Sequence, residues 1–184
     1  MQIKINRAPV LTLWASVVSE QLGHDRAAAL TLGKAVSGFA AYAKARSLGI
    51  TEDNRDSPSE RRAREKAKRE TAEVLGKLIP VATTKDGVRA LDADGKPINP
   101  ASVEKYLASK FGDGFDEARG AMAALAKSLS PAELQGHAFS LYEMFRPAIP
   151  DGVRGWGAAG VLDTDNIRSA TLAPATERRR PKSG

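Results

Sequence analysis

Residues 115–145, FDEARGAMAALAKSLSPAELQGHAFSLYEMF, decide the fold class of this chain. Apolar side chains recur at helical spacing on both sides of a central Ser130-Pro131-Ala132-Glu133. A serine followed three residues later by glutamate is a capping box, and proline suits the first turn of the helix that follows it. The stretch therefore predicts two helices of equal period that meet at one capping residue, as in an αα-hairpin.

Helical patterns also precede and follow this hairpin. We expect an amphipathic helix over residues 9–22, and a second helix from a cap at Asp25 to about Leu48, where Gly49 stops it. Asn99-Pro100 starts another helix, and Asp163 caps a short one. The chain has 184 residues, of which 31 are alanine and 5% aromatic, and this composition favours helix over sheet.

One segment has a β pattern. Between residues 72 and 91, apolar runs flank Asp86-Gly87, and Asp-Gly between apolar runs is a strong hairpin signal. Pro80 falls within this segment and is expected on an edge strand or at a bulge, because it lacks an N–H for the ladder. The predicted fold class is mainly α, with one β-hairpin near residues 72–91.

The chain length predicts one compact domain overall. Within it we distinguish four parts by composition, in chain order: a two-helix unit (1–50), a basic linker or exposed helix (51–70), a unit of β-hairpin and αα-hairpin (71–173), and a disordered basic tail (174–184). Residues 51–70 contain no large apolar side chain, so they have no face to bury.

Composition excludes several classes of protein. The absence of cysteine excludes disulfides, thiolate metal sites and cysteine nucleophiles, and two histidines are too few for a His-rich metal site. With 27% charged residues and no long apolar run, no transmembrane helix is expected. The apolar stretch from Ala8 to Val18 has no signal-peptide cleavage site, so we expect a cytoplasmic protein. We also expect no contact with a membrane, no cofactor and no metal ion.

The positive charge is concentrated in two short segments. The net charge is +6, yet residues 55–69 alone contribute +4 and residues 177–184 contribute +3, so the remainder is close to neutral. Concentrated Arg and Lys are typical of proteins that bind polyanions. The candidate phosphate-contacting residues are Arg55, Arg61, Arg62, Arg64, Lys66, Lys68, Arg69, Arg178, Arg179, Arg180 and Lys182. The alternative is a solvated, charge-rich linker with no ligand.

The second helix has a stripe of small residues, Gly33, Ser37 and Ala41, at a spacing of four. An interior glycine costs a helix about 1 kcal/mol relative to alanine, so its presence favours a close helix–helix approach. That approach is either an intrachain contact, which we favour, or the seam of a homodimer.

Other motifs are more simply explained as structural. The glycine-rich stretch at 152–157 lacks the P-loop pattern and reads as a connector. Asp92 and Asp163 begin calcium-like sequences without the required glutamate, so they read as turn and cap residues. His24 and His137 have no evident catalytic partner. Three acids, Asp113, Asp116 and Glu117, suit the positive end of a helix dipole.

These observations favour a non-enzymatic protein that contacts the phosphate backbone of nucleic acid with low sequence specificity, because no base-reading helix is evident. The alternative is a protein-interaction or assembly module, such as a homodimer, without a nucleic-acid role. An enzyme with a carboxylate-only site is the least favoured reading.

Overall fold

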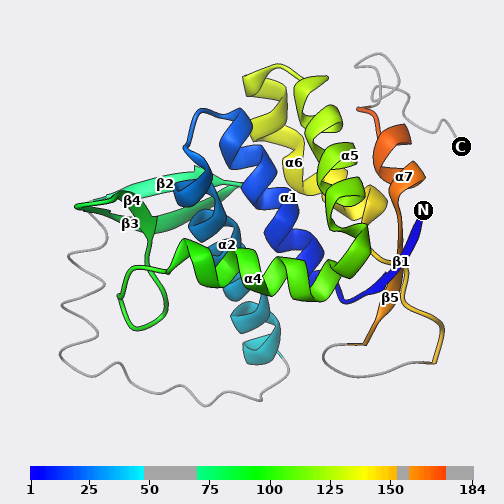
Figure 1. Ribbon diagram of the computed structural model, residues 1–184, viewed down its shortest axis with the longest axis horizontal. Helices are drawn as coiled ribbons and strands as arrows, with labels where there is room; N and C mark the ends of the chain where they lie inside the picture. The colour runs from blue at the N-terminus through cyan, green and yellow to red at the C-terminus, as the bar shows by residue number, and fades with distance from the viewer. Residues whose placement is uncertain (48–69, 153–157, 173–184) are drawn as a thin grey trace, which may run out of the picture.

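The computed structural model describes residues 1–47, 70–152 and 158–172, and most of these residues lie in helices (Figure 1). The prediction of a mainly α fold with minor β structure is confirmed. The long helices are α1 (Arg7–Gln21), α2 (Arg26–Ser47), α4 (Pro100–Phe111), α5 (Phe115–Lys127) and α6 (Pro131–Phe145). A 3-10 turn, η1 (Gly112–Gly114), joins α4 to α5, and a short α7 (Thr164–Ser169) follows the last strand.

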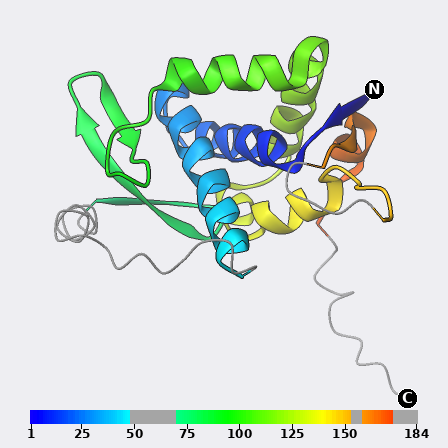
Figure 2. The same ribbon diagram turned by 90° about the horizontal axis from the view of Figure 1, so that it is seen from below.

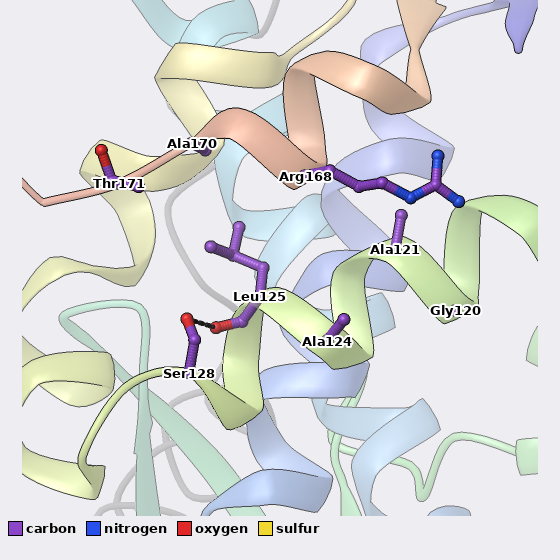
Figure 3. Close-up of a pocket in the computed structure, with 8 residues that line it drawn as sticks. All are labelled: Gly120, Ala121, Ala124, Leu125, Ser128, Arg168, Ala170 and Thr171. Carbon is purple, nitrogen blue, oxygen red and sulfur yellow. Dashed lines mark hydrogen bonds between the residues drawn. The ribbon is translucent and has the colours of Figure 1, made fainter.

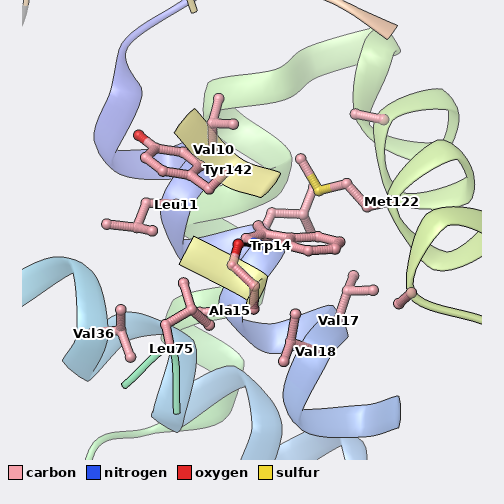
Figure 4. Packing of buried hydrophobic residues seen from close by; sticks show 14 of the residues in the cluster. Val10, Leu11, Trp14, Ala15, Val17, Val18, Val36, Leu75, Met122 and Tyr142 are labelled. Carbon is pink, nitrogen blue, oxygen red and sulfur yellow. Dashed lines mark hydrogen bonds between the residues drawn. The ribbon is translucent and has the colours of Figure 1, made fainter. Parts of the chain in front are cut away.

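Helix α1 lies at the centre of the molecule, with α2, α4, α5 and α6 around it (Figure 1). Every residue from Pro9 to Ser19 is buried, so the prediction of an amphipathic helix is wrong. Trp14 is fully buried in the core, where its indole N–H donates to the carbonyl of Ala138 at 2.8 Å (Figure 4). Its ring packs edge-on against Phe145, with 5.3 Å between the centroids.

The buried hydroxyls of α1 all have hydrogen-bond partners, most of them within the helix itself. The hydroxyls of Ser16 and Ser19 each donate to the carbonyl four residues earlier, at 2.8 Å. The Thr12 hydroxyl lies 2.7 Å from that of Ser37 on α2. Buried hydroxyls paired in this way avoid the desolvation penalty of an unsatisfied group.

The predicted caps are present where their residues are described. The Asp25 carboxylate accepts from the Ala28 N–H at 2.8 Å and starts α2. Ser130 and Glu133 form the reciprocal capping box of α6. Asn99 caps α4 and Asp163 caps α7 through their side-chain oxygens. However, α5 and α6 pack mainly on α1 and α7 rather than on each other, so they do not form the closely packed pair that the sequence suggested.

The predicted hairpin is present and belongs to a three-stranded antiparallel sheet. The strands β2 (Thr71–Val74), β3 (Lys77–Thr84) and β4 (Gly87–Ala90) lie side by side in chain order. Gly87, which starts β4, has a φ of +116°, a value that favours glycine at this turn. One face of the sheet packs on α2, where the Ala90 N–H donates to the buried Thr31 hydroxyl at 2.9 Å.

Pro80 lies in β3, the central strand, and the expectation of an edge strand or bulge is wrong. Its carbonyl accepts from the Leu91 N–H at 2.9 Å, one residue beyond the end of β4. The N–H that proline lacks would also face Leu91, just beyond the last residue pair of the β3–β4 ladder. The missing donor therefore costs the sheet no interior hydrogen bond.

A second, two-stranded sheet was not predicted. Strand β1 (Gln2–Ile5) pairs antiparallel with β5 (Gly160–Asp163), so the first and last described strands lie side by side. We call this pair the terminal ribbon. It lies at the opposite end of the helical body from β2–β4 in both views (Figure 1, Figure 2).

Candidate functional site

The predicted phosphate-contacting residues lie outside the described residues. All eleven bases fall in the ranges 48–69 and 173–184. What the structure does describe is the body to which these segments are attached. Its three ranges contain sixteen Lys and Arg residues and sixteen Asp and Glu residues. The net charge of +6 therefore resides in the ranges 48–69, 153–157 and 173–184.

The small stripe of α2 faces α1 of the same chain. A Cβ added at Gly33 would lie 2.1 Å from Ser16 Oγ and 2.4 Å from the Thr12 carbonyl oxygen. Ser37 is buried in the same contact, beside the Thr12 hydroxyl. The close intrachain approach expected of the interior glycine is thus present at Gly33. The side chain of Ala41 lies outside the described residues.

A shallow groove of about 310 Å³ runs between α5 and the end of α7 (Figure 3). Small side chains of α5 form most of its floor, with Arg168 and Thr171 on the other wall. Two of the polar side chains at the groove already have partners: Ser128 Oγ donates to the Leu125 carbonyl at 2.7 Å, and Arg168 is bound to Glu117. The groove has room for a small apolar group, and its lining presents no pair of nucleophile and base.

Arg168 belongs to a polar cluster beside the terminal ribbon. Its guanidinium donates to the Glu117 carboxylate, and the buried Thr164 hydroxyl lies 3.3 Å from the same oxygen. The hydrogen bond from Arg168 holds the pKa of Glu117 below its usual range, and that of Arg168 is raised in turn. The Met1 ammonium donates to Thr164 at 3.1 Å. This cluster ties α5 to α7, a role for Glu117 beyond the predicted one at a helix N-terminus.

The remaining motifs have structural roles where they are described. The Asp92 carboxylate accepts from the N–H groups of Asp94 and Lys96, both at 2.9 Å, as a turn residue does. His24 and His137 are half-buried, and neither side chain forms a hydrogen bond or ion pair with the rest of the described chain. Among the described residues, no group of three His, Cys, Asp or Glu side chains is placed to hold a metal ion.

A half-buried cation–π pair joins α2 to α4. The Lys34 ammonium lies 4.2 Å from the centroid of the Tyr106 ring. Burial lowers the pKa of Lys34 and raises that of Tyr106, so both groups favour their neutral forms more than they would in water. The sequence analysis missed this pair, because it joins residues 72 positions apart with no local motif.

Two comparisons by sequence and one by structure found no match. No family model and no curated protein matches the chain, and no solved structure matches its fold. Within the ranges that the structure describes, no helix combines the length and the apolar character needed to cross a membrane.

Proposed function

We propose that the protein associates with nucleic acid, contacting the phosphate backbone with low sequence specificity through its two basic segments. The observation that carries this proposal is the separation of charge: the described body holds equal numbers of acidic and basic residues, and the excess of positive charge lies elsewhere. A chain that needed positive charge only for solubility would have no reason to segregate it. The proposal includes a cytoplasmic location.

The chemistry of the segments suits phosphate. Eight of the eleven bases are arginine, whose planar guanidinium matches the oxygens of a phosphate group. No aromatic residue is interleaved with the bases in either segment, so stacking on unpaired bases is not part of the proposal. If about six of the bases engage phosphates, log K should fall with log salt at a slope of about −5.

The test is a fluorescence-anisotropy titration of two duplex DNAs of unrelated sequence. The charge-reversal variant carries Arg61→Glu, Arg62→Glu and Arg64→Glu. Its matched control carries three reversals on exposed lysines of the described body that form no side-chain hydrogen bond or ion pair with other described residues: Lys85→Glu, Lys96→Glu and Lys105→Glu. Both variants change the net charge equally.

We expect the segment variant to bind more weakly and to lose about three units of salt slope, while the control stays near the unchanged protein. Equal binding by the segment variant and the unchanged protein would overturn the proposal. Equal weakening in both variants would also overturn it, because it would show that only net charge matters. A preference of more than about tenfold between the two duplexes would contradict low specificity.

The assembly alternative loses support from the fold. Two of its three candidate residues, Gly33 and Ser37, are buried against α1 and are not exposed to a partner. Sedimentation provides the discriminating measurement. An oligomer that persists at high salt and does not bind DNA would favour the alternative.

A further inference from the structure

The six arginines whose side chains the structure describes fall into two groups. Three of them form ion pairs with carboxylates, and a fourth, the buried Arg89, donates to backbone carbonyls of its own turn at 2.8 and 3.1 Å. Arg7 and Arg146 differ from these four. Neither forms an ion pair with any carboxylate in the part of the chain that the structure describes.

Arg7 and Arg146 lie close together although they are 139 positions apart in the chain. Arg7 Nε donates to the carbonyl of Pro147 at 3.1 Å, directly after Arg146 in the chain. The Tyr142 hydroxyl donates to the Arg7 carbonyl at 3.2 Å. Burial raises the pKa of Tyr142 to about 12, and the positive charges of both arginines act against this rise.

Lys4 adds a third base to the same region. In the register of the terminal ribbon Lys4 faces Val161, and Val161 forms a bridge with Ala148 on its other side. Lys4 and Ala148 therefore lie on opposite sides of Val161, two strand spacings apart. Ala148 directly follows Pro147, whose carbonyl accepts the hydrogen bond from Arg7. Lys4 is exposed and has no ion pair with a described carboxylate. We call Lys4, Arg7 and Arg146 the ribbon-side bases.

Three acids of this end of the molecule are engaged elsewhere, and two more, the exposed Glu143 and Asp151, form no ion pair with a described base. Asp163 faces Gln2, at the far end of the ribbon from Ile5, and caps α7. Glu117 and Asp165 are both paired with Arg168. The body is neutral as a whole, yet the ribbon-side bases form no ion pair with a described carboxylate.

We propose that the ribbon-side bases form a phosphate-contacting surface on the folded body, over which nucleic acid held by the basic segments passes. The inference rests on the function proposed above and adds a contact on the ordered part of the chain. The bond from Nε to Pro147 fixes the Arg7 side chain and leaves its two terminal amino groups without a partner among the described residues. Two guanidinium N–H groups in a plane are the donors that bind a phosphate bidentately.

The test uses the full-length protein and a 20-base-pair duplex. Arg7→Glu is the obvious variant, but it also removes the bond to Pro147, so its effects on binding and on the fold are not separable. The informative variant is therefore Lys4→Glu with Arg146→Glu, two side chains that form no side-chain hydrogen bond with described residues. The matched control is Lys85→Glu with Lys96→Glu, on the turns of the opposite end of the body (Figure 1). Circular dichroism checks that both variants are folded.

We expect the ribbon-side variant to bind about tenfold or more weakly at 0.1 M salt and to lose about two units of salt slope, relative to the control. If it binds as the control does, while reversal of Arg61, Arg62 and Arg64 still weakens binding, this inference fails and the proposed function stands. If the unchanged protein does not bind the duplex at low salt, both fail. If polyglutamate competes as well as DNA of equal charge, the assignment to phosphate is wrong.

Discussion

Substitution of Gly33 by alanine tests the central packing contact of the fold. Gly33 lies on α2 at a close approach of that helix to α1. An added Cβ would lie 2.1 Å from Ser16 Oγ, 2.4 Å from the Thr12 carbonyl oxygen and 2.9 Å from the Ser16 nitrogen. Real Cβ atoms essentially never show contacts under 3.0 Å. Two of the three atoms belong to the backbone of α1, so a change of rotamer at Ser16 does not relieve the overlap, and the helices must move apart.

The expected free-energy change combines two opposing terms. Overpacking a close contact costs about 1–3 kcal/mol, and a backbone obstacle places this substitution at the upper end. Alanine is the better helix former by about 1 kcal/mol, which offsets part of that cost. The net loss is about 2 kcal/mol of unfolding free energy. For a chain of this length, the melting temperature should fall by about 4–8 °C.

Gly38 provides a matched control on the same helix. A Cβ added there would have no heavy atom within 4 Å, and the residue is exposed. Gly38→Ala therefore keeps only the gain in helix propensity, about 1 kcal/mol, and should raise the melting temperature by about 2–4 °C. The two variants have the same composition but should shift in opposite directions.

The assay is thermal and urea unfolding followed by circular dichroism at 222 nm, with both variants and the unchanged protein measured together. A melting temperature of Gly33→Ala at or above that of the unchanged protein would refute the close α1–α2 contact. A loss of stability in Gly38→Ala of similar size would show instead that any side chain on this part of α2 is harmful.

Three further predictions concern single groups. Tyr142→Phe removes a phenol whose folded pKa of about 12 exceeds its unfolded value of about 10. The raised pKa contributes to the free energy of unfolding below pH 10, and this contribution is lost as the pH rises from about 10 to 12. The variant lacks the contribution, so its free energy of unfolding, measured by urea titration, should fall less between pH 9 and pH 11.5 than that of the unchanged protein. Ser130→Ala removes the α6 cap and should cost about 1 kcal/mol in urea unfolding, whereas unchanged stability would contradict the capping role. Arg168→Ala should raise the pKa of Glu117 toward its usual value in an NMR titration, and an unmoved pKa would show that the ion pair does not form in solution.

The elements with local signals could be predicted from the sequence. Caps at Asp25, Asn99, Ser130 and Asp163 are read from one or two residues each, and all four are present. The Asp86-Gly87 turn is likewise predicted from two neighbouring residues, and it is present. These features are predictable because the side chain that causes them lies within a few residues of the backbone that it satisfies.

The errors concern features that depend on distant parts of the chain. Strand β1 was missed because its four residues carry little signal until β5 pairs with them across more than 150 positions. Pro80 was expected at an edge because the sequence does not show where the β3–β4 ladder ends. The separation of α5 from α6 follows from their packing on α1, which no pattern within residues 115–145 records.

Helix α1 shows what a closer reading of the sequence could have found. Residues 8–19 contain no charged side chain, and the serines and threonine among them are residues whose hydroxyls can bond to their own helix. A stripe of apolar residues alone suggests an amphipathic helix, whereas twelve positions without charge on any face are typical of a helix that is buried all round. The absence of charge, more than the period of the apolar residues, marks the centre of this fold.

In the candidate site, the net charge of the body and the distribution of its charges are different properties. Counting along the sequence isolates the two basic segments, because their bases are neighbours in the chain. It misses Lys4, Arg7 and Arg146, which become neighbours only when β1 pairs with β5 and the Arg7 side chain reaches Pro147. A body with equal numbers of acids and bases can still present a positive surface if its ion pairs gather the acids elsewhere, as Arg168 does with Glu117 and Asp165. The salt slope of the ribbon-side variant is therefore the measurement that tells whether the folded body takes part in binding or only carries the segments that do.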